Sequence, residues 1–530
     1  MITMRPGPVG VYPRSPGPKR PPGEAIAGTW VDSEAMSPPR DSSVATRPLV
    51  IASNRGPVAF DLDEDGEPVS NRGGGGLVTG LTSALQLTGG LWVASAMSDG
   101  DRLMAMRSPG GRIEVLDEDA KYHLRYLNVA PDRFDRYYNV ISNRILWFLH
   151  HYLFDVARAP RLGDTVTQAW QDYTAVNRMF AVALGEECSE GRQPAFLIQD
   201  YHLSLVPAML RKRTPRALVS HFSHTPFAGP TYFRILPKDI AEATLRGMLG
   251  ADVLGFQSED WAENFLLTCR SHLGTGVDLR RRHVDLDGRR TLVRVYPISI
   301  DAEALREAAR SDEVRKLRRW IARWRGDCKL IVRVDRTELS KNIQRGFLAF
   351  EVLLQRHPEW AGRVKFMTLL NPSRRAIPEY RVYTRDCLRT ADRINQEYGL
   401  PDWKPIEVIV RDDYPRAVAA YELYDTLMVN PVFDGMNLVA MEGPTVNRRN
   451  GAVILSRNAG AHALLGRHAL AVNPFDVGQT ADALHTALTL PEEARKRMAA
   501  GLRRVVRAHP PSRWVGSQVE DLERAASARD

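Results

Sequence analysis

Short runs of consecutive apolar residues recur along most of the chain, and stretches with helical periodicity separate them. The runs that predict strands are residues 195–200, 217–223, 252–257, 291–297, 329–335, 364–370, 406–410, 426–430, 452–456 and 469–473. Because their apolar residues are consecutive, they are typical of parallel strands that are covered on both faces. The stretch 340–357 instead repeats apolar side chains at helical spacing, at Ile343, Phe347, Phe350 and Leu354. This alternation predicts an α/β protein with two doubly wound parallel sheets, each a Rossmann-like domain.

Changes in composition divide the chain further. The first residues are rich in proline and glycine and have no apolar period, which predicts a disordered extension. We place the boundary between the two domains near residue 300, where an apolar run gives way to a long basic helix. The expected segments are an extension over 1–47, a first domain over 48–300, a second domain over 301–490, a C-terminal helix over 491–514 and a flexible tail over 515–530.

Composition and charge narrow the class of protein. The chain has 530 residues and a net charge of +9. Its four cysteines lie far apart without a CxxC pair, which favours neither a zinc site nor a disulfide scaffold and fits a reducing cytoplasm. No apolar run reaches the roughly 18 residues of a membrane span. The basic clusters belong to no recognised nucleic-acid module and are interpreted as solvated surfaces. We therefore expect a cytoplasmic protein that binds neither nucleic acid nor membrane.

Polar residues follow several of the apolar runs, and ligands of open α/β sheets bind at the carboxyl ends of strands. Arg336 follows the run 329–335, and Lys341 comes five residues later, next to a predicted helix start. A guanidinium fork and an ammonium at this place can grip a diphosphate. An ion pair of Arg336 with Asp335 or Glu338 explains the pattern equally well.

Four consecutive glycines, residues 73–76, open another predicted helix. Glycines let backbone amides approach a phosphate or a sugar, and a helix N-terminus adds partial positive charge. The run matches neither a P-loop nor GxGxxG. A flexible turn is the alternative interpretation.

Two further strand ends carry an acid or a histidine. Asp200 can accept a proton or orient a sugar hydroxyl, although aspartate at this place also caps helices. His221 and His224 follow the next run. Two histidines without a third ligand do not make a zinc site, and a single histidine at a strand end is more often structural.

The segment 430–444 has acids on both sides of an apolar helix start. The amides of residues 435–437 are expected to be exposed there, and they can bind hydroxyls or a phosphate. Asp434 can hold a sugar hydroxyl, and Glu442, two helical turns further on, can bind a ribose diol. The alternative is a capping Asp434 and a solvated Glu442, which fits Glu442 poorly because its neighbours are apolar.

Taken in order, these motifs resemble those of the trehalose-6-phosphate synthase family, retaining glycosyltransferases of GT-B architecture (family GT20). The similarity runs from about residue 48 to about residue 508. It rests on the motifs SNRGPV, GGLVTG, YYNVISNRILW, DYHL, HTPF, LGFQSE, VYPISID, RTELSK, PSRR, DGMNLVAMEG and VNPFD.

The resemblance implies an activity. The enzyme would transfer glucose from UDP- or GDP-glucose to glucose 6-phosphate with retention, giving trehalose 6-phosphate, and it would need no cofactor and no metal. The first domain would bind the acceptor and the second the donor across an interdomain cleft. The C-terminal helix would pack back toward the first domain. The oligomeric state stays open, a homo-oligomer included.

The resemblance also implies roles for single residues. The expected donor ligands are Gly76, Arg336, Lys341, Asp434, Gly435, Met436, Asn437, Leu438 and Glu442. The expected acceptor ligands are Arg55, Tyr138, Trp147, Asp200 and Arg374. Among these, Arg336 and Lys341 would neutralise the departing diphosphate. Asp200 would orient acceptor hydroxyls and His224 would contact the transferred glucose, so these four form the expected catalytic set.

Some positions depart from the usual residues of the family. Glu338 stands for aspartate, Asn342 for glycine, Gln199 for histidine, Phe433 for a basic residue and Met441 for lysine. These departures leave the donor base open. They also favour in part a related branch, which joins a nucleotide cyclitol to an aminocyclitol phosphate. A catalytically silent sugar-phosphate sensor is a third hypothesis, and it predicts the loss of diphosphate or ribose ligands that are present here.

Overall fold

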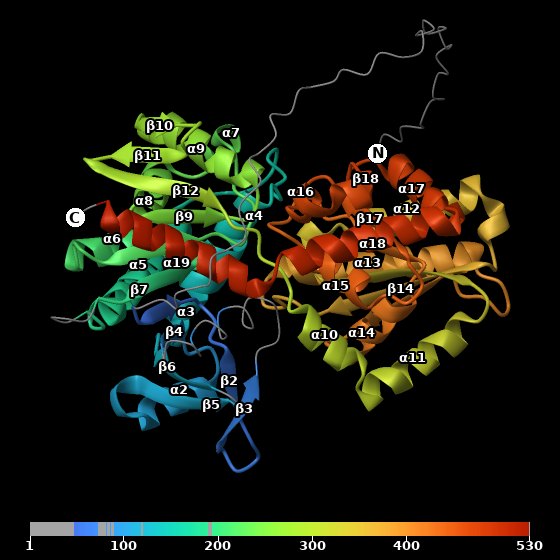
Figure 1. The fold of residues 1–530 in the computed structure, drawn as a ribbon, viewed down its shortest axis with the longest axis horizontal. Coiled ribbons are helices and arrows are strands. Elements are labelled where there is room, and N and C mark those ends of the chain that lie inside the picture. Colours follow the sequence, from blue (N-terminus) through green and yellow to red (C-terminus); the bar gives the residue numbers. More distant parts are fainter. Residues whose placement is uncertain are drawn as a thin grey trace, which may run out of the picture. The chain divides into compact units, whose positions relative to one another are not determined.

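The computed structural model describes residues 47–72, 90–117, 120–188 and 193–528, together with Leu81 and Leu85. The described residues belong to one compact unit. Two separate sheets carry its fold, and helices cover both (Figure 1). The α/β fold with two doubly wound sheets that the sequence predicts is confirmed.

The first sheet lies in the N-terminal half of the chain. Its strands are β1 (Leu49–Ala52), β4 (Leu91–Ser95), β5 (Arg112–Asp117), β6 (Ala120–Leu127), β7 (Ala195–Gln199), β8 (Leu218–Phe222), β9 (Val253–Phe256), β10 (Gly276–Asp278), β11 (His283–Leu286) and β12 (Arg289–Val295). They are ordered β10-β11-β12-β9-β8-β7-β1-β4-β6-β5. The pairs from β12 to β6 are parallel, and the pairs at the two edges are antiparallel. Every residue of β1, β7 and β8 is buried, which explains their continuous apolar runs.

The second sheet is parallel throughout. Its strands are β13 (Lys329–Arg336), β14 (Val364–Asn371), β15 (Ile406–Val410), β16 (Thr426–Val429), β17 (Ala452–Ser456) and β18 (Leu470–Val472), in the order β15-β14-β13-β16-β17-β18. The order reverses direction at β13 and β16, so the ends of these two strands form the topological switch point where ligands bind in such sheets.

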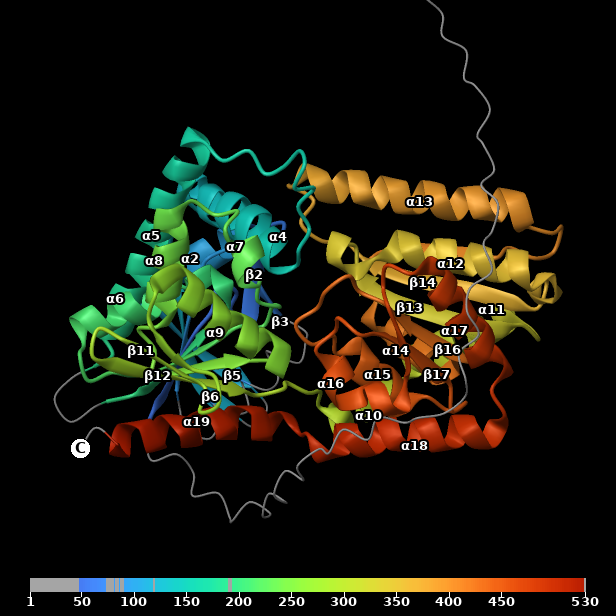
Figure 2. The ribbon, with the colours of Figure 1, turned by 90° about the horizontal axis from the view of Figure 1, so that it is seen from above.

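Helices cover both faces of each sheet. On the first sheet these are α2 (Asp99–Arg107), α3 (Pro131–Asp135), α4 (Trp147–His150), α5 (Asp164–Gly185), α6 (Val206–Arg213), α7 (Pro230–Phe233), α8 (Lys238–Met248) and α9 (Glu259–Leu273). On the second sheet these are α10 (Ala302–Ala309), α11 (Asp312–Arg325), α12 (Ile343–Arg356), α13 (Pro378–Tyr398), α14 (Tyr414–Leu423), α15 (Val439–Val446), α16 (Ala461–Leu465) and α17 (Val477–Thr489). Figure 2 shows α12 and α13 on one side of the second sheet and α14 and α15 on the other. The predicted stripe of α12, which runs from Ile343 to Leu354, is buried in this core.

Some strands were not predicted. A hairpin of β2 (Val58–Leu62) and β3 (Pro68–Arg72) stands apart from both sheets. The edge strand β5 alternates apolar and polar residues, with Ile113 buried and Glu114 exposed. A search for continuous apolar runs does not detect such strands, because only one of their faces is covered.

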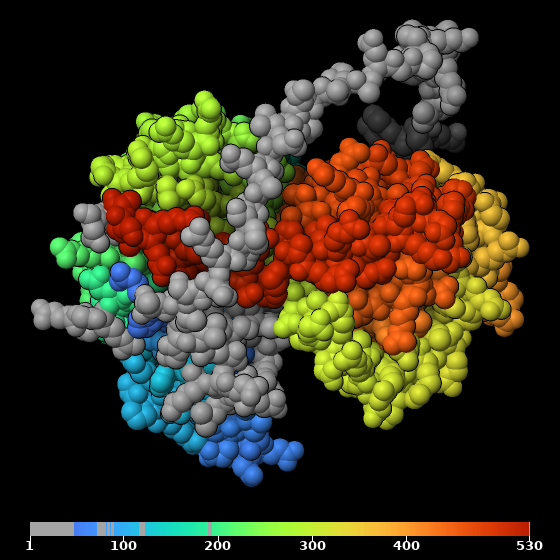
Figure 3. All heavy atoms as spheres, in the orientation of Figure 1, coloured from blue at the N-terminus to red at the C-terminus, as the bar shows by residue number. Residues whose placement is uncertain are grey.

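The chain ends with two helices that lie on different sheets. α18 (Glu492–Ala508) packs against α15 and β17, whereas α19 (Pro511–Ser527) packs against β8 and β9. The two helices follow one another along one side of the molecule, and in Figure 3 they form a red band on its surface. Pro510 separates them because proline cannot continue a helix.

The structure corrects two expectations here. The predicted C-terminal helix 491–514 is divided between α18 and α19, and α18 packs on the second sheet instead of packing back toward the first domain. Residues 515–527 were expected to belong to a flexible tail, but they are helical as part of α19. Trp514, Val515 and Leu522 form its buried stripe, and Tyr296 donates a hydrogen bond to Asp521 at 2.5 Å. This stretch is charged and rich in alanine, so its apolar stripe was not recognised in the sequence. In the described part of the chain, no helix has both the length and the apolar character that crossing a membrane requires.

Candidate active site

Lys341 and Asp434 meet at the switch point of the second sheet. Lys341 ends the 3-10 helix η4 (Leu339–Lys341) after β13, and Asp434 lies in the loop after β16. The Lys341 Nζ donates to Asp434 Oδ2 at 2.5 Å, and the side chains are only 12% and 14% exposed. Burial disfavours the charged lysine, but Asp434 and Asp335 outweigh burial, so the pKa of Lys341 is raised. An ammonium has three donors, so two N–H groups remain for a ligand.

The loop after Asp434 offers unpaired backbone donors. The amides of residues 435–438 donate no hydrogen bond to any described residue. Asn437 has a φ of 75°, a left-handed conformation that asparagine tolerates, and Leu438 caps α15. N–H groups at a helix start carry partial positive charge and suit phosphate or hydroxyl oxygens. The loop therefore presents a row of donors beside the Lys341–Asp434 pair.

Gly435 brings this loop against the first sheet. A Cβ atom on Gly435 would lie 1.7 Å from the backbone oxygen of His224, which follows β8. The Nε1 of Trp261 donates to the Gly435 carbonyl at 3.2 Å. Only glycine permits this approach, so the ends of a strand in each sheet meet here.

Arg336 ends β13 and is half exposed. Its Nη1 lies 3.1 Å from Oε1 of Glu338, and its guanidinium lies 5.8 Å from the ring centre of Trp147. The ion pair that the sequence left as an alternative is therefore present. It involves one end of the guanidinium, and half of the side chain remains accessible.

Glu442 is not fully solvated. It lies in α15, is partly buried, and its Oε2 accepts a hydrogen bond from the Tyr421 hydroxyl at 2.9 Å. Burial raises the pKa of the Glu442 carboxyl, and the bond from Tyr421 opposes this. The charge of Asp335 contributes to raising the pKa of both Tyr421 and Lys341.

On the first sheet, the predicted acceptor residues surround the short helix η3 (Tyr201–Leu203). Tyr138 stacks on His202, with ring centres 5.7 Å apart, and the charge of Arg55 helps to lower the pKa of His202 to about 3, after burial and Arg374. Tyr138 belongs to η2 (Arg136–Leu146), which is a π-helix, a form often found at functional sites. Aromatic and cationic groups therefore converge here.

Trp147 and Arg374 connect the two sheets. The Arg374 guanidinium lies 3.9 Å from the ring centre of Trp147, donates to the Tyr380 hydroxyl at 2.7 Å and donates to the Tyr201 hydroxyl at 3.2 Å. Burial disfavours its charge, but Tyr201 and Glu338 outweigh burial and raise the pKa of Arg374. The Trp147 Nε1 is buried and bonds to none of the described residues. Arg374 follows a strand of the second sheet, yet it lies against residues of the first.

Asp200 has a strained backbone. Its φ of 72° and ψ of 169° lie in a region that is essentially restricted to glycine, and such strain is found at functional sites. Its amide donates to the Phe222 carbonyl at 2.7 Å, and its Oδ1 accepts from the His224 amide at 3.1 Å. Burial raises the pKa of the Asp200 carboxyl to about 6, although the amides of His224 and Tyr201 oppose this. This carboxyl can therefore exchange a proton near neutral pH. Asp200 is the N-cap residue of η3, but its side chain makes no capping hydrogen bond to this helix.

His224 uses both ring nitrogens within the protein. Gln257 Nε2 donates to its Nδ1 at 3.4 Å, so Nε2 carries the proton and faces Gln199 Oε1 at 2.9 Å. Burial lowers the pKa of His224 to about 3, which keeps the ring neutral. A contact of this ring with glucose stays a prediction. Gly76 lies outside the described residues, and its contact with the donor also stays a prediction.

Several departures from the usual family residues have a structural explanation. Asn342 has a φ of 60°, which glycine and asparagine both adopt readily. Gln199 holds the ring of His224. Phe433 packs on Tyr152 with ring centres 4.6 Å apart, and Met441 is buried in the core.

Sequence reasoning missed two residues and one contact of this region. Tyr201 and Tyr380 hold Arg374. The sequence indicated Glu338 only as a partner of Arg336, whereas its carboxylate contacts both arginines. Tyr201 lies within the motif DYHL, so proximity to Asp200 was an available signal. No signal indicated Tyr380, because it comes from inside α13 and reaches Arg374 only through the fold.

One group of side chains has the composition of a metal site. Ligand atoms of His357, Glu359 and His485 lie within 4.8 Å of one another. However, the two imidazole rings stack face to face, 3.6 Å apart and 11° from parallel, so their in-plane lone pairs do not converge. Trp360 Nε1 also donates to His485 Nδ1 at 3.2 Å. The geometry suits a stacked pair better than a bound metal.

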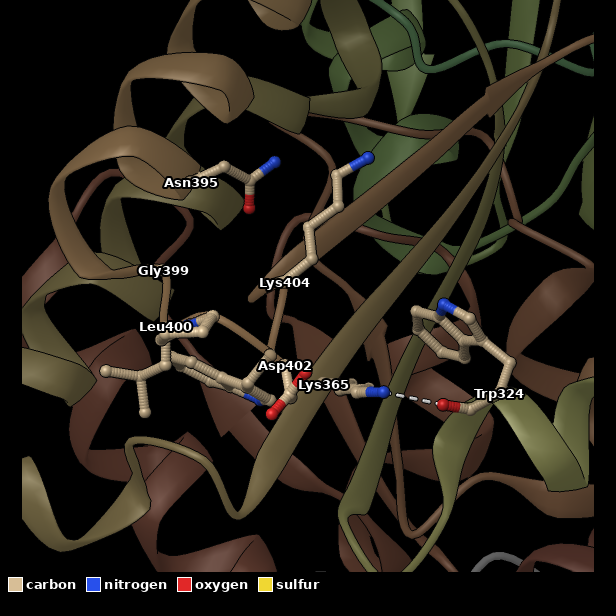
Figure 4. A pocket seen from close by; sticks show the side chains of 9 residues that line it. Trp324, Lys365, Asn395, Gly399, Leu400, Asp402 and Lys404 are labelled. Carbon is tan, nitrogen blue, oxygen red and sulfur yellow. Dashed lines mark hydrogen bonds between the residues drawn. The ribbon is translucent and has the colours of Figure 1, made fainter.

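A surface hollow of about 470 Å³ lies near the C-terminal end of α13 (Figure 4). Trp324, Lys365, Asn395 and Lys404 are among its lining residues, and Lys365 Nζ donates to the Trp324 carbonyl at 2.6 Å. None of the predicted site residues lines it. The free amides, buried cations and strained backbone gather at the two strand ends instead, and we place the site there.

Comparisons with known proteins agree on one family. The model of glycosyltransferase family 20 matches residues 47–524. The chain is 32% identical over 505 residues to the UDP-forming alpha,alpha-trehalose-phosphate synthase of Botryotinia fuckeliana, covering 91% of this chain and 89% of that protein. It is 29% identical over 486 residues to validamine 7-phosphate valienyltransferase of Streptomyces hygroscopicus subsp. jinggangensis, covering 91% and 95%.

Solved structures agree with this. One, described as trehalose-6-phosphate from E. coli bound with UDP-2-fluoro glucose, has a TM-score of 0.78 at 29% identity and covers 90% of this chain and 99% of its own. Another, a UDP-forming alpha,alpha-trehalose-phosphate synthase from Burkholderia xenovorans in complex with glucose-6-phosphate, has a TM-score of 0.77 at 27% identity and covers 90% and 100%. The fold is therefore that of the GT-B trehalose-phosphate synthases, and the chain belongs to glycosyltransferase family 20.

Proposed function

We propose that the protein is an alpha,alpha-trehalose-phosphate synthase that transfers glucose from UDP-glucose to glucose 6-phosphate with retention. The observation that carries the proposal is the meeting of two polar groups, one from each sheet. Lys341, Arg336 and the free amides of residues 435–438 lie on one side, and Arg374, Trp147 and Asp200 lie on the other. UDP-forming relatives and a relative's complex with glucose-6-phosphate support this choice of substrates.

On the donor side, Lys341 and Arg336 bind the diphosphate, and the loop 434–438 holds the glucosyl hydroxyls. As the bond between C1 and the phosphate oxygen breaks, negative charge grows on the departing diphosphate. The two cations and the loop amides stabilise that charge as it develops. Glu442 binds the ribose hydroxyls and Tyr421 holds it in place.

On the acceptor side, Arg374, Arg55 and Tyr138 bind the phosphate of glucose 6-phosphate, and Trp147 packs against the sugar. Asp200 orients the attacking hydroxyl. The new bond forms between this oxygen and C1 on the face that the diphosphate leaves, and the hydroxyl proton passes to the departing phosphate oxygen. Trehalose 6-phosphate and UDP are the products, and no carboxylate nucleophile is needed.

The experiment is product analysis with separate donors. The protein is mixed with glucose 6-phosphate and UDP-, GDP- or ADP-glucose, and the products are identified by mass spectrometry and by the anomeric couplings in NMR. We expect α,α-linked trehalose 6-phosphate, with UDP-glucose as the preferred donor. Absence of turnover with all three donors would overturn the proposal.

A second candidate is supported by the valienyltransferase relative. In that case the protein joins a nucleotide cyclitol to an aminocyclitol phosphate. The same assay with a nucleotide-linked cyclitol and an aminocyclitol phosphate distinguishes the two. A silent sensor would bind glucose 6-phosphate in calorimetry and form no product with any pair.

A further inference from the structure

We infer that Glu338 is a positioning residue that fixes Arg336 and Arg374 relative to each other, so that one buried carboxylate prepares the binding of both substrates. The inference rests on the proposed function, in which Arg336 binds the donor diphosphate and Arg374 the acceptor phosphate.

The contacts of Glu338 reach both substrate groups. Its side chain is completely buried. Its Oε1 accepts a hydrogen bond from Ser373 Oγ at 2.8 Å and lies 3.1 Å from Arg336 Nη1 and 3.8 Å from Arg374 Nη1. Ser373 and Arg374 are neighbours in the loop after β14, so the carboxylate ties this loop to the end of β13. Its Oε2 is buried and has no partner among the described residues.

The carboxylate is charged under all ordinary conditions. Burial alone would raise its pKa, but Arg336, Arg374 and Lys341 lower the pKa of Glu338 to about 2. A buried charge of this kind is stable only while its cations stay close. The buried carboxylate holds both arginine side chains close to it. This attraction restricts the rotamers of Arg336 and Arg374 before any ligand binds.

Trp147 shows why an anion is needed at this place. Both guanidinium groups lie against its ring, Arg374 at 3.9 Å and Arg336 at 5.8 Å from the ring centre. Two cations on one ring repel each other, and the side chain of Arg374 is only 9% exposed, so little water screens the repulsion on its side. The negative charge of Glu338 offsets this repulsion. Arg336 can then keep one face free for the donor diphosphate, and Arg374 can keep one face free for the acceptor phosphate.

A purely structural role makes a different prediction. If Glu338 only neutralised a buried charge, its loss would lower the melting temperature and leave the remaining active molecules with unchanged substrate affinities. As a positioning residue, its loss must weaken the binding of donor and acceptor together.

The test uses the full chain with Glu338→Gln, which keeps the shape and removes the charge, and Glu338→Asp, which keeps the charge on a shorter side chain. We expect Glu338→Gln to raise KM for UDP-glucose and for glucose 6-phosphate about tenfold each, the size expected for a lost charged hydrogen bond. Glu338→Asp should give values between those of the wild type and the Gln variant. A change in neither KM, or in only one, overturns the inference. If the Gln variant does not fold, the Asp variant decides, because its two KM values must still rise together.

Calorimetric titration with UDP and with glucose 6-phosphate separates this inference from the proposed function. Failure of the wild type to form trehalose 6-phosphate would refute the proposed function. The positioning role is tested independently, because it requires that UDP and glucose 6-phosphate both bind more weakly to Glu338→Gln than to the wild type. Glu351→Gln is the matched control, because Glu351 pairs with Arg393 at 2.6 Å on α12 and contacts no site residue. We expect unchanged KM values in this control. A rise in both values there would refute the assignment of the effect to Glu338.

Discussion

Replacing Lys341 with methionine separates the catalytic and structural contributions of the Lys341–Asp434 pair. Methionine keeps most of the side-chain volume and removes the charge that faces the departing diphosphate. A unit charge about 4 Å from a phosphate oxygen contributes about 4 kcal/mol at an effective dielectric constant of about 20. The loss of one such group from a preorganised site lowers the rate by about a hundred- to a thousandfold. We therefore expect kcat/KM for UDP-glucose to fall by this factor.

The same substitution leaves Asp434 without its cation. Breaking a buried ion pair costs about 3–5 kcal/mol, and because both side chains keep slight exposure we expect about 3 kcal/mol. The melting temperature without ligand should fall accordingly. The double variant Lys341→Met with Asp434→Asn removes the unpaired charge, so stability should recover while activity stays low. Steady-state kinetics and thermal melts at one pH measure both effects. A single variant that keeps more than about a tenth of wild-type kcat/KM, or a double variant that regains activity, would refute the reasoning.

Three further predictions concern single residues. Arg374→Lys loses the paired hydrogen bonds to two tyrosines. In kinetic assays KM for glucose 6-phosphate should therefore rise about tenfold or more, while KM for the donor changes little. An equal rise in the two KM values would contradict this prediction. Burial raises the pKa of Asp200 to about 6, so wild-type kcat/KM should fall as the pH drops below about 6 and this carboxylate becomes protonated. A pH profile of Asp200→Asn should lack that acidic limb, and its persistence would assign the limb to another group. Gly435→Ala places a Cβ against the backbone oxygen of His224, so activity and melting temperature should both fall, whereas Gly516→Ala meets nothing within 4 Å and should change neither.

The sequence predicts the buried part of the fold well. Residues 406–410 and 452–456 are strands with the predicted bounds. Every residue of 452–456 is buried, as expected for an apolar strand that is covered on both faces. The strand β15 lies at the edge of its sheet, where only Ile406 is fully buried and Glu407 interrupts the apolar run. The antiparallel edge strands were not predicted, because β5 is covered on one side only and β10 is very short. The helix over 511–527 was not predicted, because its apolar side chains are few and far apart in the sequence.

The site is predictable only in part, for a similar reason. Motifs at strand ends identify Lys341, Asp434 and Asp200, because polar groups after an apolar run are visible locally. The partners that set their chemistry come from elsewhere in the chain. Tyr421 lies 21 residues from Glu442, and Tyr380 reaches Arg374 from within a helix. No local pattern shows these contacts, and only the folded chain brings them together.

The position of α19 has a consequence for how the protein is made. Ser220 donates to Gln518 across a buried contact, and Trp514 meets Phe222 edge-on, with ring centres 5.1 Å apart. These contacts cover β8, which the ribosome produces nearly three hundred residues before α19. The N-terminal half of the chain is synthesised first. The side of its sheet at β8 therefore stays uncovered until the ribosome has synthesised residues 511–527. Nascent chains stalled before that point should attract chaperones that recognise unburied apolar surface.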